Sequence, residues 1–138
     1  MSGQTPSSFG LSPYAKAMGM AIAEIDAGSP VIVMDFAPHA MGRPGYLHGG
    51  AIGGVLEMAG YAAIAAELER QGLTMRIKPI NVSTEYLRSG LPERIHARGE
   101  VVRAGRRVAN VRVEAWQSDR ERPVACCWIN FKLSPKEA

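Results

Sequence analysis

The sequence predicts an α+β fold in which one long central helix is wrapped by a curved, mostly antiparallel sheet of about six strands. Three observations predict it. The chain has 138 residues, 46% of them hydrophobic and 21% charged, which suits one domain with one core. Residues 49–70 are helix-like, with an alanine-rich apolar interior and charges gathered at the C-terminal end. Every segment after them has the pattern of a strand, and the short breaks between these strands favour antiparallel pairing.

The N-terminal third predicts a short helix and a hairpin. Ser12-Pro13 is typical of a helix start, and the helix is expected to run to Met18 and end at Gly19. Strands are expected over 21–26 and 31–37. Residues 38–46, with two prolines and two glycines, are expected to form a loop.

The central helix is expected over Gly49–Arg70, a length of about 33 Å at the standard rise per residue. Gln71-Gly72 predicts its end. Four strands follow, in which valine and isoleucine alternate with polar residues: 75–88, 95–103, 107–117 and 124–133. A helix this long and apolar must be covered by the sheet.

Composition and motifs exclude several classes of protein. The net charge is only +3 and the basic residues form no long run, so no nucleic-acid partner is expected. The adjacent Cys126 and Cys127 would point to opposite faces of a strand, so they cannot easily bond to each other, and no zinc spacing occurs. The glycines match no dinucleotide or phosphate-loop motif. We therefore expect no metal and no cofactor.

The chain is expected to be cytoplasmic. Its N-terminus lacks the basic and apolar regions of a signal peptide. The longest apolar run is interrupted by Glu57, so no membrane span is expected. Residues 1–10, rich in Ser, Gly and Pro, are expected to be disordered, and residues 11–138 to form a single domain.

One acid, Glu57, stands alone in the middle of the apolar helix, on the same row as Gly49, Gly53 and Tyr61. A lone carboxylate is costly to bury unless something requires it. Each helical glycine costs roughly 1 kcal/mol relative to alanine, so the glycines also need a reason. Close packing and a smooth trough leading to Glu57 both explain them, and both interpretations stay open.

The start of the helix is a second candidate feature. Gly49 and Gly50 leave its first amide groups uncovered by side chains, where the helix dipole adds partial positive charge. A substrate carbonyl placed there would be polarised, and a carboxylate could then attack it or activate a water. Gly49 and Glu57 lie about 12 Å apart along the axis. This separation is too large for one substrate carbonyl to contact the Gly49 amide and the Glu57 carboxylate of the same chain easily. It therefore predicts a dimer in which two subunits share each site.

Two further groups of residues carry alternative interpretations. His48, at the junction of loop and helix, is expected to hold backbone groups by hydrogen bonds. The arginines around Gly105, at positions 103, 106 and 107, and Arg88 at a strand end either form solvated tips or hold phosphate groups.

These motifs resemble the hot-dog fold acyl-CoA thioesterases, in particular the phenylacetate-degradation type. The resemblance covers residues from about 18 to 133. Its strongest part is His48-Gly49-Gly50, followed nine positions after the histidine by the acid Glu57. Residues 85–90 and 102–109 support it.

The resemblance implies a hydrolase that splits an acyl-CoA thioester into free acid and coenzyme A. In that family the amide after the histidine polarises the carbonyl and the acid is nucleophile or general base, which implies these roles for Gly49 and Glu57, with His48 beside them. The family forms homodimers, often dimers of dimers, with sites at the subunit interface. The substrate-binding residues expected from the resemblance and the helix pattern are Gly50, Met58, Tyr61, Arg88, Ser89, Gly105, Arg106 and Arg107.

The sequence departs from the family pattern at auxiliary polar positions. Gly42 stands where many members have Asn or Gln, Pro79 where a Ser or Thr often orients water, and Tyr61 where a second branch uses Thr. These gaps favour an alternative, a hot-dog protein that binds acyl-CoA without turning it over. A dehydratase of the same fold ranks below both, because His48 is the only histidine near the site.

Overall fold

The computed structural model describes residues 10–136, so nearly all of the predicted disordered segment lies outside the described residues. The elements in chain order are α1 (Pro13–Ala17), β1 (Met20–Asp26), β2 (Ser29–Met34), the 3-10 helix η1 (Pro38–Ala40), α2 (Gly49–Arg70), β3 (Met75–Tyr86), β4 (Ile95–Ala104), β5 (Val108–Trp116) and β6 (Ala125–Pro135). The predicted helices and all six predicted strands are present, with ends that differ by a few residues.

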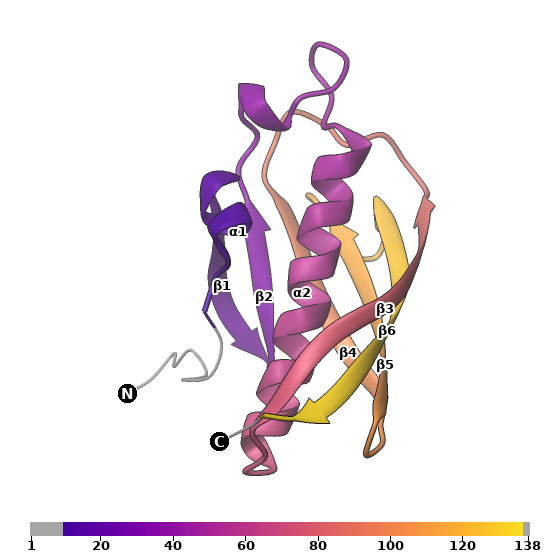
Figure 1. Cartoon of the computed structure of the whole chain (residues 1–138). Coiled ribbons are helices and arrows are strands. Elements are labelled where there is room, and N and C mark those ends of the chain that lie inside the picture. Colours follow the sequence, from indigo (N-terminus) through magenta and orange to yellow (C-terminus); the bar gives the residue numbers. More distant parts are fainter. Residues whose placement is uncertain (1–9, 137–138) are drawn as a thin grey trace.

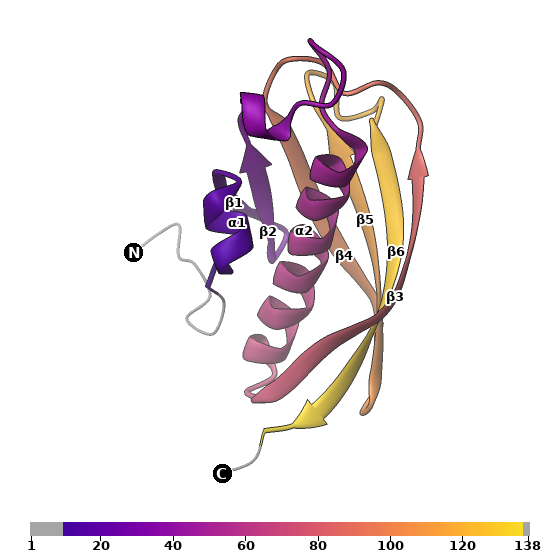
Figure 2. The ribbon, with the colours of Figure 1, turned by 45° about the horizontal axis from the view of Figure 1, so that its top comes forward.

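The six strands form one antiparallel sheet in the order β1-β2-β4-β5-β6-β3. The sheet curves around α2, which lies along its concave side (Figure 1, Figure 2). This confirms the predicted architecture. The sheet order also leaves β3 at one edge, where its only strand neighbour within residues 10–136 is β6.

Two glycines let α2 and the sheet approach closely. A Cβ atom on Gly99 in β4 would lie 2.9 Å from the carbonyl oxygen of Ala59, and a Cβ on Gly60 would lie 2.6 Å from Cδ1 of Ile129. The contact at Gly99 is with helix backbone, which cannot move aside, so packing requires glycine there, whereas the Ile129 methyl could shift to admit a side chain at position 60. The sheet-facing side of α2 is buried beneath side chains such as Ile129.

The prediction that Glu57 prevents α2 from resembling a membrane span is wrong. By length and composition α2 could cross a membrane, with a mean hydropathy of 1.3 over the relevant window. One acid is too few to lower that average below the range of membrane helices. The buried share of that window, 67%, identifies α2 as the core helix of this fold.

The prediction of a simple loop over residues 38–46 needs a correction. The segment begins with η1, whose residue Ala40 is fully buried. The carbonyl of Ala40 accepts the N–H of His48 at 2.8 Å, and Met41 pairs with Leu47 in an isolated bridge. These backbone bonds fold the segment back on itself, so it anchors the start of α2.

Candidate active site

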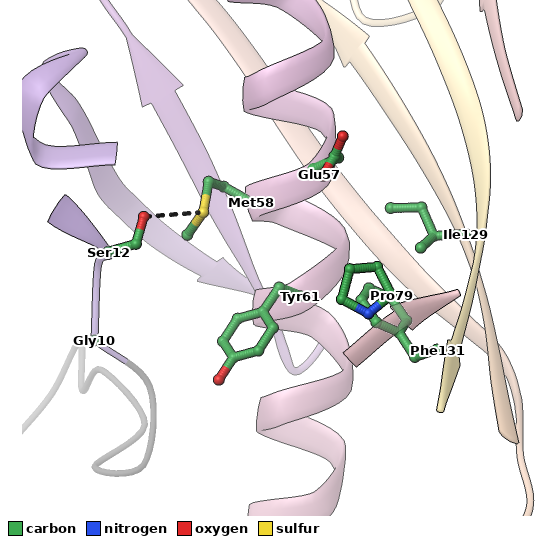
Figure 3. Close-up of a pocket in the computed structure, with 8 residues that line it drawn as sticks. All are labelled: Gly10, Ser12, Glu57, Met58, Tyr61, Pro79, Ile129 and Phe131. Carbon is green, nitrogen blue, oxygen red and sulfur yellow. Dashed lines mark hydrogen bonds between the residues drawn. The ribbon is translucent and has the colours of Figure 1, made fainter. Parts of the chain in front are cut away.

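Glu57 lies in the middle of α2, and its side chain is exposed. In a single chain the carboxylate therefore does not carry the cost of burial. Glu57 borders a cavity of about 250 Å³, shown in Figure 3. Its other lining residues are Gly10, Ser12, Met58, Tyr61, Pro79, Ile129 and Phe131.

The walls of this cavity are mainly apolar. Pro79 of β3 and two residues of β6, Ile129 and Phe131, lie on the side toward which Glu57 points (Figure 3). On the other side, the Ser12 hydroxyl donates to the Met58 sulfur at 3.7 Å. Pro79, one of the expected departures from the family pattern, thus lines the same cavity as Glu57 and brings no polar side-chain group to it.

Cys127 offers no competing nucleophile near Glu57. Its side chain is buried in the core. Burial, with smaller contributions from Cys126 and from the charge of Glu57, raises the pKa of the Cys127 thiol to about 12. The thiol therefore stays protonated at neutral pH, and a protonated thiol is a poor nucleophile. Both cysteines are free, as expected from their adjacency.

His48 forms the N-cap of α2. Its Nδ1 accepts the N–H of Gly50 at 2.8 Å. This bond confirms the predicted role of His48 in holding backbone, and it requires that Nδ1 carry no proton. It also occupies the Gly50 amide, so the predicted substrate contact through that amide is not open in this arrangement.

At the N-terminal end of α2, the N–H of Gly49 is a free hydrogen-bond donor within residues 10–136. No hydrogen bond between residues 10 and 136 occupies its N–H. Gly49 and His48 border a cavity of about 260 Å³ together with Gly42, where a Cβ atom would lie 3.2 Å from Cα of His48. Gly42, another expected departure from the family pattern, therefore lies beside the start of α2. A free amide at the positive end of a helix dipole is able to polarise a carbonyl oxygen placed against it.

The predicted arginines lie at opposite ends of the sheet. Arg88 and Ser89 follow the end of β3, near the start of α2. The Gly105–Arg107 hairpin instead borders a cavity with Gln71, beyond the last residue of α2. The carbonyl of Arg107 accepts the N–H of Leu133, which pairs with Ile77 near the beginning of β3. One protomer thus does not bring Arg106 and Arg107 to Gly49.

Residues 44–124 match the family model of the thioesterase superfamily. The chain belongs to the thioesterase superfamily. It is a thioester hydrolase with the hot-dog fold, as the sequence motifs predicted.

Curated relatives of this thioesterase include the medium/long-chain acyl-CoA thioesterase YigI of Escherichia coli, 30% identical over 115 residues that cover 74% of each chain. The Salmonella typhimurium protein of the same name is 27% identical over 121 residues, 78% of this chain and 77% of that one.

Solved structures share the fold. A protein from Chromobacterium violaceum is 38% identical, with a TM-score of 0.69 over 91% of this chain and 85% of that one. The phenylacetic acid degradation protein PaaI from Thermus thermophilus, 22% identical, has a TM-score of 0.71 over 88% of this chain and 98% of that one. At 22% identity, the similarity to the Thermus thermophilus protein shows a shared fold and nothing more.

The structure of the thioesterase adds two residues to the predicted site. The hydroxyl of Tyr86 donates to the carbonyl of Gly49 at 3.0 Å. Arg122 and Arg88 border one cavity of about 350 Å³, which shares Ser89 with the cavity at Gly49. Tyr86 lies within residues 85–90, which support the family resemblance, so the sequence indicates its importance. Arg122 lies in a turn between two strands, where no local pattern distinguishes it from a solvated arginine.

Proposed function

We propose that this thioesterase hydrolyses acyl-CoA thioesters, with Glu57 as general base or nucleophile and the Gly49 amide polarising the thioester carbonyl. The observation that carries the proposal is the free N–H of Gly49 at the start of the same helix that presents Glu57 to an apolar cavity. The relatives named as acyl-CoA thioesterases support coenzyme A as the leaving group.

The chemistry requires one base and one oxyanion donor. As a base, Glu57 takes a proton from water, and the resulting hydroxide attacks the carbonyl carbon. The oxygen gains negative charge, which the Gly49 N–H stabilises by a hydrogen bond. The carbon–sulfur bond then breaks, and the coenzyme A thiolate leaves and takes up a proton. As a nucleophile, Glu57 would form an anhydride that water hydrolyses in a second step.

The two groups belong to different subunits in this proposal. Within one helix they are separated by eight residues, or about 12 Å. The edge strand β3 leaves its outer backbone groups without a strand partner, and its side chains Ile80 and Tyr86 are 57% and 55% exposed. Pairing of β3 with the same strand of a second subunit would cover this edge. A dimer of this kind, or a pair of such dimers, would set the start of one α2 beside the middle of the other.

The acyl group is assigned to the cavity at Glu57. Met58 and Tyr61 border it with the apolar side chains of β6. Such walls favour an apolar acyl chain over a charged one, because a buried charge without a partner is costly.

The phosphate groups of coenzyme A are assigned to Arg88 and Arg122. Among residues 10–136 neither arginine forms an ion pair. The cavity that they share has Ser89 in common with the cavity at Gly49, and arginine is suited to phosphate. Arg106 and Arg107 lie at the other end of the protomer, so they would contact the same coenzyme A only from another subunit.

The main test measures thiol release from a panel of acyl-CoA esters by the wild type and by Glu57→Gln. Loss of the base should lower kcat about 100-fold or more, while the fold stays intact because Glu57 is exposed. Equal rates in both proteins would remove Glu57 from the mechanism. Tight binding of the panel by calorimetry without any thiol release would instead support the non-catalytic acyl-CoA binder.

A second test addresses coenzyme A itself. Arg122→Ala should raise KM for acyl-CoA about ten-fold and leave KM for the matching N-acetylcysteamine thioester unchanged, because that substrate has no phosphate. Arg76→Ala, an exposed arginine at the start of β3, serves as the control for lost surface charge. A rise in KM for both substrates would contradict the assignment.

A further inference from the structure

The peptide unit between Gly49 and Gly50 is held by side chains on both of its polar atoms. Its N–H donates to Nδ1 of His48 at 2.8 Å, and its carbonyl accepts the hydroxyl of Tyr86 at 3.0 Å. His48 is the cap of the same helix, whereas Tyr86 comes from the end of β3, 37 residues from Gly49. The phenol therefore ties the first turn of α2 to the edge of the sheet.

The first turn of α2 needs such support. Four of the six residues from Gly49 to Gly54 are glycine, the residue with the greatest backbone freedom. An oxyanion donor contributes only when its direction is fixed before the substrate arrives. The preceding peptide already has its carbonyl held, because the oxygen of His48 accepts from the N–H groups of Ala51 and Ile52 at 3.0 and 3.1 Å.

Tyr86 contacts this turn closely. Its ring lies 3.7 Å from where a Cβ on Gly49 would stand, and its hydroxyl lies 3.4 Å from the same point on Gly53. In a single chain the Tyr86 side chain is more than half exposed, and its hydroxyl bonds to the carbonyl of the residue that carries the free amide. This placement favours a role at the candidate site over a role in stabilising the core.

We propose that Tyr86 is a positioning residue, whose hydroxyl fixes Gly49 so that its N–H points at the thioester carbonyl. This inference rests on the proposed function of Gly49 as oxyanion donor. It assigns no proton transfer to the phenol: the hydrogen bond to the Gly49 carbonyl stays in place throughout the reaction.

The test is Tyr86→Phe, which keeps the ring and removes the hydroxyl. We expect kcat for acyl-CoA hydrolysis to fall about ten-fold, because the Gly49 N–H would no longer be held in line with the thioester carbonyl, with KM and Tm nearly unchanged. The control is Tyr14→Phe, since Tyr14 also rests against a glycine of α2, Gly54, but at a distance from Gly49 along the helix. Its kcat should equal that of the wild type.

A second readout does not depend on activity. Amide hydrogen exchange at Gly49, Gly50 and Gly53 should become faster in Tyr86→Phe and stay unchanged at the C-terminal end of α2. Unchanged exchange, or a wild-type kcat in an active enzyme, would overturn the inference. A wild-type protein that hydrolyses no thioester would overturn the proposed function instead, while the exchange measurement would still decide whether Tyr86 orders the turn.

Discussion

At Gly49 the candidate catalytic group is a backbone N–H, which ordinary side-chain substitutions leave in place. The surroundings of this residue nevertheless allow the group to be removed. His48 has φ −71° and ψ 139°, the extended conformation that a residue before proline adopts. Gly49 is the first residue of α2, the helical position at which proline is tolerated.

Gly49→Pro should therefore keep the fold and remove the donor. We expect kcat/KM to fall about 100- to 1000-fold, as found when one oxyanion donor is lost. Gly49→Ala is the matched control, because it keeps the N–H and its Cβ would lie at an ordinary 3.7 Å from the ring of Tyr86. Kinetics and thermal unfolding of both variants check the prediction. Equal activity of the proline and alanine variants would exclude the amide from catalysis.

At the scale of elements, the contact between α2 and β4 decides how deeply the helix sits in the sheet. The contact is made by Gly99, whose missing side chain admits the backbone of α2 at Ala59. Packing at this distance leaves no room for adjustment, because a helix backbone cannot move without disturbing its own hydrogen bonds.

Gly99→Val should lower the free energy of unfolding by about 1–3 kcal/mol or more, the usual cost of overpacking a core. Gly105→Ala in the β4–β5 turn should change it little, since its Cβ would have 3.4 Å to the nearest atom and its backbone is not left-handed. Urea unfolding of the two variants measures the difference. Similar stabilities would mean that the sheet can shift away from α2.

At the scale of the whole molecule, a single chain leaves its candidate site incomplete. Glu57 is exposed, no strand of residues 10–136 pairs with the outer edge of β3, and the Gly49 amide, free within those residues, lies far from the carboxylate along α2. The proposed dimer explains these three features together, because each subunit would complete the site of the other.

Mixed dimers of Glu57→Gln and Gly49→Pro test this directly. In a mixed dimer one site would carry both substitutions and the other would carry neither. Random mixing should therefore restore about a quarter of wild-type activity, since half of the dimers are mixed and half of their sites are intact. Coexpression of two differently tagged chains allows the mixed species to be purified and assayed. Activity no greater than that of the two parent variants would place both groups of a site in one chain.

The sequence by itself determined the order of the elements, the span of α2 and the capping role of His48. These depend on hydrophobic periodicity and on contacts between residues a few positions apart, which a sequence displays directly. The motif from His48 to Glu57 also predicted the family. Local patterns predicted only a loop where the 3-10 helix lies, because the backbone bonds of this segment depend on how it folds back onto Ala40.

Only the tertiary structure decided which candidate residues meet. The sheet order puts Tyr86 against Gly49 and Arg122 beside Arg88, and it sends Arg106 and Arg107 to the far end. It also leaves the side chain of Glu57 exposed, beside a cavity that residues of β3 and β6 line. Strand order and the covered face of a helix arise from contacts between distant segments, and the alternation within each strand is the same whichever strand becomes its neighbour.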